Sequence, residues 1–375
     1  MKGRRIAVFF CIGILAFSGC KKADSEGGTA GSVTRAQYCF TEDGLLHRQS
    51  LRGGSKIAYF DYRTRTCYPL CGDPNCLHDS RECTAVYLAD TNCIGRIGDK
   101  WYYQKDSGTD AQVFYCCDLD GKNEKVLGEF PRYCTGTSLF FDHFLVAATE
   151  EWFVDEETGE VSENMKCGIY RYDLESGKEE LLVPERESQL GAYCVYGCHE
   201  NLLAYLELTD EAEMKYELRV MDLETKRVTE PLGDRRLWSP APYAMSGSLL
   251  VCSVQDGGAW EVVELDIESG EWNRIWLEGQ KGTADIIWSP ELKLLRLYDE
   301  IEGRPCHRTW QYTEKGECVL VREDWEEYPF SPIVIKDGVI VGPYGGWDDT
   351  TGFTLAVIGT EDYLAGKSNF ISLQD

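Results

Sequence analysis

Short runs of Val, Ile, Leu, Tyr, Phe and Trp, broken by Gly, Asp, Asn and Ser, recur along most of this chain. No long window shows a helical period with capping residues, so the pattern is typical of an all-β protein with many short strands. The clearest unit is Tyr170–Lys178 (YRYDLESGK), which predicts the end of one strand, a tight polar turn and the start of the next strand. Weaker copies follow the same order: FYCCDLDGK from Phe114, LRVMDLETK from Leu218, VELDIESGE from Val263 and WQYTEKGE from Trp310.

The copies recur with a regular period. The aspartates before the turn, Asp61, Asp118, Asp173, Asp222 and Asp266, stand 44 to 57 residues apart. A period of 40 to 60 residues with about four strands per unit is typical of a β-propeller. We therefore predict about seven four-stranded blades, with six or eight as alternatives. The seven units are residues 38–68, 94–127, 138–182, 193–229, 243–276, 286–321 and 333–360.

The turns and the strand entries also carry repeated residues. In the turns, Gly is expected to take the positive-φ position and Asp to bond nearby backbone amides. Three aromatic-Ser-Pro triplets, Trp238–Pro240, Trp288–Pro290 and Phe330–Pro332, are expected to form strand-entry turns with a packed ring. The stretch WSPELKLLRL from Trp288 resembles the WSPDGKxIAF repeat of TolB-like propellers, with Glu291 and Leu292 in place of Asp and Gly. This resemblance implies the fold and leaves the function open, because such propellers serve peptidases, sugar-processing enzymes and binding proteins.

The first residues predict export. Lys2, Arg4 and Arg5 precede the apolar run Ile6–Phe17, which has the length of a signal peptide. The sequence ending in Cys20 resembles a bacterial lipobox, which implies cleavage before Cys20 and lipid on its thioether; an ordinary secretory signal with an incidental Cys is the alternative. We expect a lipid-anchored protein on the outer face of the cell membrane. The predicted organisation is a signal peptide at 1–19, a lipidated Cys and flexible tether at 20–36, and one propeller domain at 37–375 with a Cys/His loop insert at 67–92.

The charge limits the partners of such a protein. The formal net charge of the whole chain is −26, and loss of the three basic residues of the signal makes it −29. An acidic protein of this kind is not suited to bind nucleic acid or to adhere electrostatically to anionic lipid. The membrane is therefore expected to be contacted through the N-terminal lipid alone.

The sharpest local motif is a cluster of cysteines between the first and second units. Cys67, Cys71, Cys76, His78 and Cys83 fall in one loop, and a loop of this length within a compact fold needs something to hold it. A structural Zn²⁺ on Cys71, Cys76, His78 and Cys83 would do so, as would disulfides among these cysteines, with Cys67 as a possible partner. Unlinked thiols are the third possibility. The segment is also similar to a Cys-Pro-Cys-x-His insert of lipoprotein propellers from anaerobic Gram-positive bacteria, which implies location and fold only.

Motifs of catalysis are missing from the sequence. It contains no G-x-S-x-G elbow, no H-E-x-x-H helix and no Gly-rich phosphate loop. The four remaining His, at 47, 143, 199 and 307, are expected to be structural or exposed. We therefore expect a non-enzymatic binding or scaffold protein for a protein, peptide or glycan ligand, without a catalytic residue and without a certain cofactor. The alternative is a hydrolase or lyase acting on glycans or peptides in the propeller channel. The acidic excursion Glu150–Asn164 is a candidate binding loop.

Overall fold

A computed structural model describes most of the chain, and its contacts divide it between Gly233 and Asp234 into two compact units. The signal segment, Cys20 and the Trp238 triplet lie outside the described residues. The described residues are 32–35, 38–41, 43–51, 54–80, 82–89, 91–106, 112–130, 132–154, 161–237, 244–246, 248–256, 259–275, 287–289, 292, 294–313, 317–325, 330–348 and 352–373.

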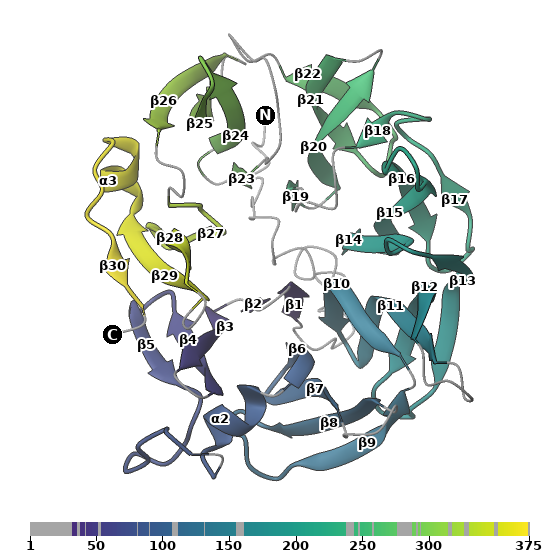
Figure 1. Ribbon diagram of the computed structural model, residues 1–375, viewed down its shortest axis with the longest axis vertical. Coiled ribbons are helices and arrows are strands. Elements are labelled where there is room, and N and C mark those ends of the chain that lie inside the picture. Colours follow the sequence, from purple (N-terminus) through teal and green to yellow (C-terminus); the bar gives the residue numbers. More distant parts are fainter. Residues whose placement is uncertain are drawn as a thin grey trace, which may run out of the picture. The chain divides into compact units, whose positions relative to one another are not determined.

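The unit that ends at Gly233 contains four sets of four antiparallel strands, which we number as blades one to four (Figure 1). Blade one is β2 (Tyr38–Phe40), β3 (Gly44–Leu51), β4 (Gly54–Asp61) and β5 (Thr66–Pro69). Blade two is β6 (Thr91–Ile97), β7 (Lys100–Asp106), β8 (Gln112–Asp118) and β9 (Lys125–Phe130). Blade three is β10 (Tyr133–Phe141), β11 (Phe144–Val154), β12 (Val161–Asp173) and β13 (Glu179–Ser188). Blade four is β14 (Tyr193–His199), β15 (Leu202–Asp210), β16 (Lys215–Asp222) and β17 (Val228–Thr229).

The unit that begins at Asp234 contains three further sets. Blade five is β19 (Ala244–Ser246), β20 (Leu249–Asp256), β21 (Ala259–Asp266) and β22 (Trp272–Ile275), and a short β18 (Arg236–Leu237) also pairs with β20. Blade six is β23 (Ile287–Ser289), β24 (Leu294–Ile301), β25 (Arg304–Tyr312) and β26 (Cys318–Asp324). Blade seven is β27 (Val334–Lys336), β28 (Val339–Asp348), β29 (Gly352–Gly359) and β30 (Ile371–Ser372), with α3 (Thr360–Leu364) before its last strand. Seven four-stranded sets in the described chain confirm the predicted blade pattern.

The repeated turns have the predicted chemistry. The carboxylate of Asp173 accepts hydrogen bonds from the amides of Glu175 and Ser176, at 3.0 and 2.9 Å, and Gly177 has a φ of 70°. These amide bonds hold the pKa of Asp173 below its usual value. The turns at Asp222 and Asp266 repeat the same bonds, which shows that these aspartates serve the architecture.

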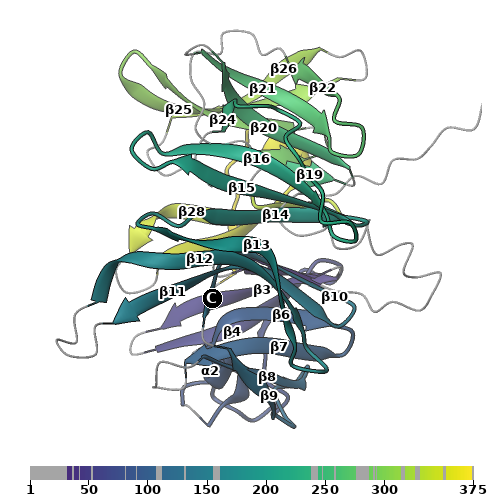
Figure 2. The ribbon, with the colours of Figure 1, turned by 90° about the vertical axis from the view of Figure 1, so that its right-hand side faces the viewer.

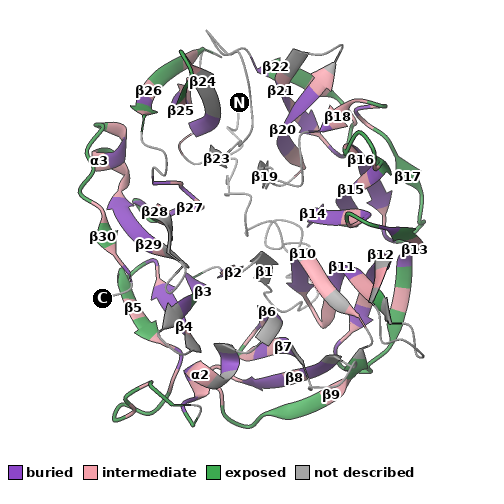
Figure 3. Cartoon of the chain, viewed as in Figure 1, coloured by how far each residue is buried: buried purple, intermediate pink, exposed green. Residues whose placement is uncertain are grey.

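The hydrophobic core lies between and within the sheets. Figure 3 shows β8 as mainly buried and the outer strand β9 as mainly exposed. Neighbouring blades pack closely, because a Cβ on Gly95 of β6 would clash with the Phe140 ring on β10. Figure 2 shows the strands of blades two and three side by side. At the entry to blade seven, the buried Phe330 ring stacks on Phe370 at 4.6 Å, as predicted for the aromatic-Ser-Pro turn.

Three features differ from, or add to, the expected organisation. Residues 32–35, assigned to the tether, form β1 (Ser32–Arg35), which pairs with β2 of blade one and β10 of blade three. Within the insert at 67–92, the first residues belong to β5, and a short helix α2 (Thr84–Ala89) follows the loop. The acidic excursion extends the β11–β12 hairpin as far as the pair Val154 and Val161, and residues 155–160 lie outside the described residues. No helix in the described segments is long and apolar enough to span a bilayer.

Candidate metal centre and adjoining pocket

Both ends of the cysteine loop are anchored in the core. At the start, the Leu70 amide donates to the Ile57 carbonyl at 3.0 Å, and the Leu70 side chain is buried. At the end, α2 buries Ala85 and Leu88 completely. Between these anchors the loop has little hydrophobic support, since the Leu77 side chain is 82% exposed. A loop with fixed ends and an exposed middle depends on its polar groups for order.

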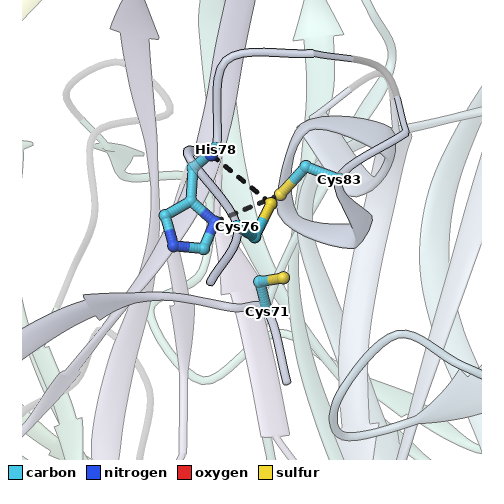
Figure 4. A group of neighbouring side chains, drawn as sticks. All are labelled: Cys71, Cys76, His78 and Cys83. Atoms are coloured by element: carbon cyan, nitrogen blue, oxygen red, sulfur yellow. Dashed lines mark hydrogen bonds between the residues drawn. The ribbon is translucent and has the colours of Figure 1, made fainter. Parts of the chain in front are cut away.

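Four of the predicted ligands meet in this loop. The ligand atoms of Cys71, Cys76, His78 and Cys83 all lie within 4.8 Å of one another (Figure 4). The Nδ1 atom of His78 is 3.3 Å from the Cys83 Sγ, and the His78 amide donates to the Cys76 Sγ at 3.4 Å. The sequence spacing thus brings three thiols and one imidazole to one point, which is the donor set of a closed tetrahedral zinc site.

The backbone at His78 supports a special role for this residue. His78 has a φ of 55°, in the left-handed region that residues with a Cβ seldom adopt. Such a conformation costs about 1 kcal/mol or more and persists where the surroundings require it. Here it turns the imidazole toward the Cys83 sulfur.

Ionisation of one thiol in the cluster disfavours ionisation of its neighbours. Burial tends to raise the pKa of Cys71, but hydrogen bonds from the Asp73 backbone, the Thr84 side chain and the neighbouring thiols outweigh it and lower that pKa. The pKa of Cys83 is raised to about 11, first by burial and then by its neighbours Cys76 and Cys71. One thiolate therefore disfavours the next, and only a bound cation would allow three thiolates so close together.

Cys67, the remaining candidate, lies apart from the four. Its Sγ is 3.5 Å from the Nε2 of His47, and burial raises the pKa of Cys67 to about 11. His47 is itself buried, with only 1% of its surface exposed. Burial and the Lys56 charge lower the pKa of His47 to about 4, so its imidazole is neutral. Cys67 and His47 thus form a separate neutral pair within blade one.

A pocket of about 350 Å³ adjoins the loop, and the sequence did not predict it. It lies among blade one, blade two and the start of the loop. Its aromatic residues include Tyr68, which is 45% exposed and lies against Tyr59 with ring centroids 5.7 Å apart. Its lining residues are Asp43, Tyr59, Asp61, Tyr68, Pro69, Leu70, Cys71, Gly72, Arg96, Trp101, Leu119 and Asp120. The pocket therefore combines three carboxylates and one guanidinium with apolar and aromatic walls.

Asp43 is the most strongly held of these carboxylates. It accepts hydrogen bonds from Tyr59 Oη at 2.6 Å and Thr41 Oγ1 at 2.8 Å, and it pairs with Arg96 at 2.9 Å. Burial acts to raise the pKa of Asp43, but these partners lower it overall. Arg96 pairs with Asp43, and Lys122 pairs with Asp120 at 3.0 Å, so the carboxylate of Asp61 leaves the pocket with an excess of one negative charge.

Comparisons with known proteins identify the fold. No protein-family model and no curated protein sequence matches this chain. Among solved structures, a puromycin-hydrolysing peptidase of Mycobacterium tuberculosis is 12% identical over 91% of this chain and 53% of its own, with a TM-score of 0.54. The β-propeller domain of the Trilobed protease from Pyrococcus furiosus is 11% identical over 91% and 93% of the two chains, with a TM-score of 0.49. TolB from Acinetobacter baumannii is 17% identical over 88% and 77%, with a TM-score of 0.38.

The seven four-stranded sets of the described chain and the likeness to the puromycin-hydrolysing peptidase give the fold as a β-propeller, as the sequence predicts. Identities this low show the fold alone. The chain spans about half the length of the peptidase it matches, so the peptidase activity of that protein is not transferred to this chain.

Proposed function

We propose that this chain is a lipid-anchored, extracytoplasmic binding protein that captures a ligand in the pocket beside the cysteine loop. The pocket is the observation that carries the proposal, since a concave site of about 350 Å³ lies within the range of small-ligand sites. The N-terminal lipobox at Cys20 supports the anchor and the location. The membrane contact is through lipid on Cys20, and the propeller presents the pocket outside the cell.

In this proposal a structural Zn²⁺ on Cys71, Cys76, His78 and Cys83 holds one wall of the pocket. Zinc–sulfur bonds of about 2.3 Å in a tetrahedron place the sulfurs about 3.8 Å apart, so side-chain adjustments of about 1 Å would complete the site. Four protein ligands leave no position for a reactive water, which makes the role structural. Cys71 also lines the pocket, so the metal would fix the pocket wall directly.

The charge of the pocket favours a cationic ligand. Arg96 and Lys122 offset two of its three carboxylates, and three thiolates on Zn²⁺ would add one further negative charge at the wall. The half-exposed Tyr68 ring offers a face for an ammonium or guanidinium group. We therefore assign as ligand a peptide that carries Lys or Arg side chains, and the net charge of the protein would speed its arrival.

Binding of a Lys-rich peptide, its acetylated form and neutral cell-wall oligosaccharides to the full-length protein in detergent tests this function. We expect saturable binding of the Lys-rich peptide, weakened by salt and by acetylation. Asp61→Asn should lower affinity about two- to fivefold, as expected for one partly exposed charge contact. Asp222→Asn is the matched control, because Asp222 has the same turn position in blade four and does not line the pocket.

Three outcomes would overturn the proposal. Equal binding of the acetylated and the unmodified peptide would exclude recognition of positive charge. Preference for an oligosaccharide would assign the pocket to glycans. Loss of peptide binding in Asp222→Asn as well as Asp61→Asn would show that the pocket is not the site. The hydrolase or lyase alternative would need two free carboxylates that converge in the pocket, and of its three carboxylates Asp43 is paired with Arg96 and Asp120 with Lys122.

A further inference from the structure

A second cysteine contact, outside the loop, lies between blades two and three. Cys93 belongs to β6 and Cys134 to β10, and both pack in one hydrophobic cluster with Phe140. Their thiol groups are within hydrogen-bonding reach of each other. The two cysteines are far apart in the sequence and belong to different sheets, so no local sequence motif predicts this contact.

The surrounding backbone holds the two thiols in place. β6 has a bulge between Thr91 and Ile94 in its pairing with β7, and Cys93 lies in that bulge. The fully buried Gln104 of β7 reaches across to blade three. Its Nε2 donates to the Arg132 carbonyl at 2.6 Å, and its Oε1 accepts from the Cys134 amide at 3.3 Å. These two hydrogen bonds of the Gln104 side chain hold the backbone at Cys134 against blade two.

The strands that carry the two cysteines lie close together. Gly95, two residues beyond Cys93, lies directly beneath the Phe140 ring of β10, where a Cβ would clash. The close approach of β6 to β10 is therefore built into the packing of the blades. A disulfide needs Cα atoms about 4.4 to 6.8 Å apart, so it can form only where two strands approach closely.

We propose that Cys93 and Cys134 form a disulfide that links blade two to blade three when the protein folds under oxidising conditions. The oxidant is a small-molecule or protein disulfide. One thiolate attacks it and releases its first thiol, and the second cysteine then attacks the mixed disulfide and releases the other. Two thiols and one external disulfide thus become one internal disulfide and two external thiols. The modification does not depend on the lipid anchor, on zinc or on the pocket.

The environment of the pair dictates when the bond forms. The hydrogen bond that the Cys134 thiol donates to Cys93, together with burial, raises the pKa of Cys134 well above its usual value. A buried thiol with little thiolate reacts slowly, so the bond would form before β6 and β10 pack together. Once formed, the same burial would protect it from exchange.

Refolding of the full-length protein in a glutathione redox buffer, followed by alkylation and non-reducing peptide mapping, tests the proposal. We expect one peptide pair that joins Cys93 to Cys134 and separates on reduction. The oxidised protein should melt about 5 °C above the reduced protein. Cys93→Ser and Cys134→Ser should each abolish both effects, whereas Cys252→Ser, which removes a buried cysteine in blade five, should keep both.

Full alkylation of Cys93 and Cys134 in a natively folded, oxidatively refolded sample would overturn the proposal. So would a map in which either residue is joined to another cysteine. Because the wild-type map decides by itself, the test stands even where a serine variant fails to fold.

Discussion

Removal of zinc from the cysteine loop is the perturbation with the sharpest expected result. The loop segment between Leu70 and Cys83 buries little apolar surface, so its order would depend on the metal. Zinc at 1,000 times its dissociation constant stabilises the folded state by about 4.1 kcal/mol. For about 340 folded residues the unfolding entropy is about 0.7 kcal/mol/K, so loss of the metal should lower Tm by about 6 °C.

Two measurements check this expectation on the purified full-length protein. Metal analysis should find one zinc per chain, and chelation should remove it and shift Tm by the amount above. Limited proteolysis should then cut near the exposed Leu77 much faster in the metal-free form. Cys76→Ser should reproduce the chelated state without chelator, whereas Cys67→Ser should retain zinc, because Cys67 contacts His47 instead.

The reasoning would fail in either of two ways. A protein without stoichiometric zinc, whose Tm and loop cleavage do not respond to added metal, would exclude the metal centre. Zinc lost in Cys67→Ser as readily as in Cys76→Ser would show that the ligand set has been assigned to the wrong cysteines.

Three further predictions concern stability and location. His47 has a folded pKa of about 4 and an unfolded pKa near 6.5, so its contribution to folding stability is fully present above pH 6.5. Denaturant titrations should show the free energy of unfolding fall by about 1.4 kcal/mol per pH unit from pH 6.5 down to pH 4. An equally steep profile in a His47→Gln variant would refute this. Gly95→Ala places a Cβ against the Phe140 ring and should lower the free energy of unfolding in urea by at least about 2 kcal/mol. Gly359→Ala, with open space around the new Cβ, should change it by about 0.5 kcal/mol or less. Equal effects of the two substitutions would contradict the packing argument. Cys20→Ser should move the protein from the membrane fraction to the soluble fraction of producing cells, and unchanged membrane association would exclude lipid on Cys20 as the anchor.

The sequence alone determined the repeated parts of this protein. Alternation of apolar and polar residues, and turns such as the one at Asp173, act over a few residues, so strands and hairpins can be predicted locally. The meeting of Cys71, Cys76, His78 and Cys83 was also predictable, because one short loop carries all four. Short helices such as α2 were not predicted, since six residues contain too little of a period to recognise.

Tertiary structure decided everything that depends on contacts between blades. The pocket joins Asp43 to Arg96, and the Cys93–Cys134 contact joins two blades through Gln104. These pairings depend on the register of each strand, on a bulge in β6 and on how closely the sheets approach. A one-residue shift in register turns every side chain to the other face, so no local pattern could have placed them. The chain therefore specifies its blades locally, and it specifies its candidate sites only when the blades are packed.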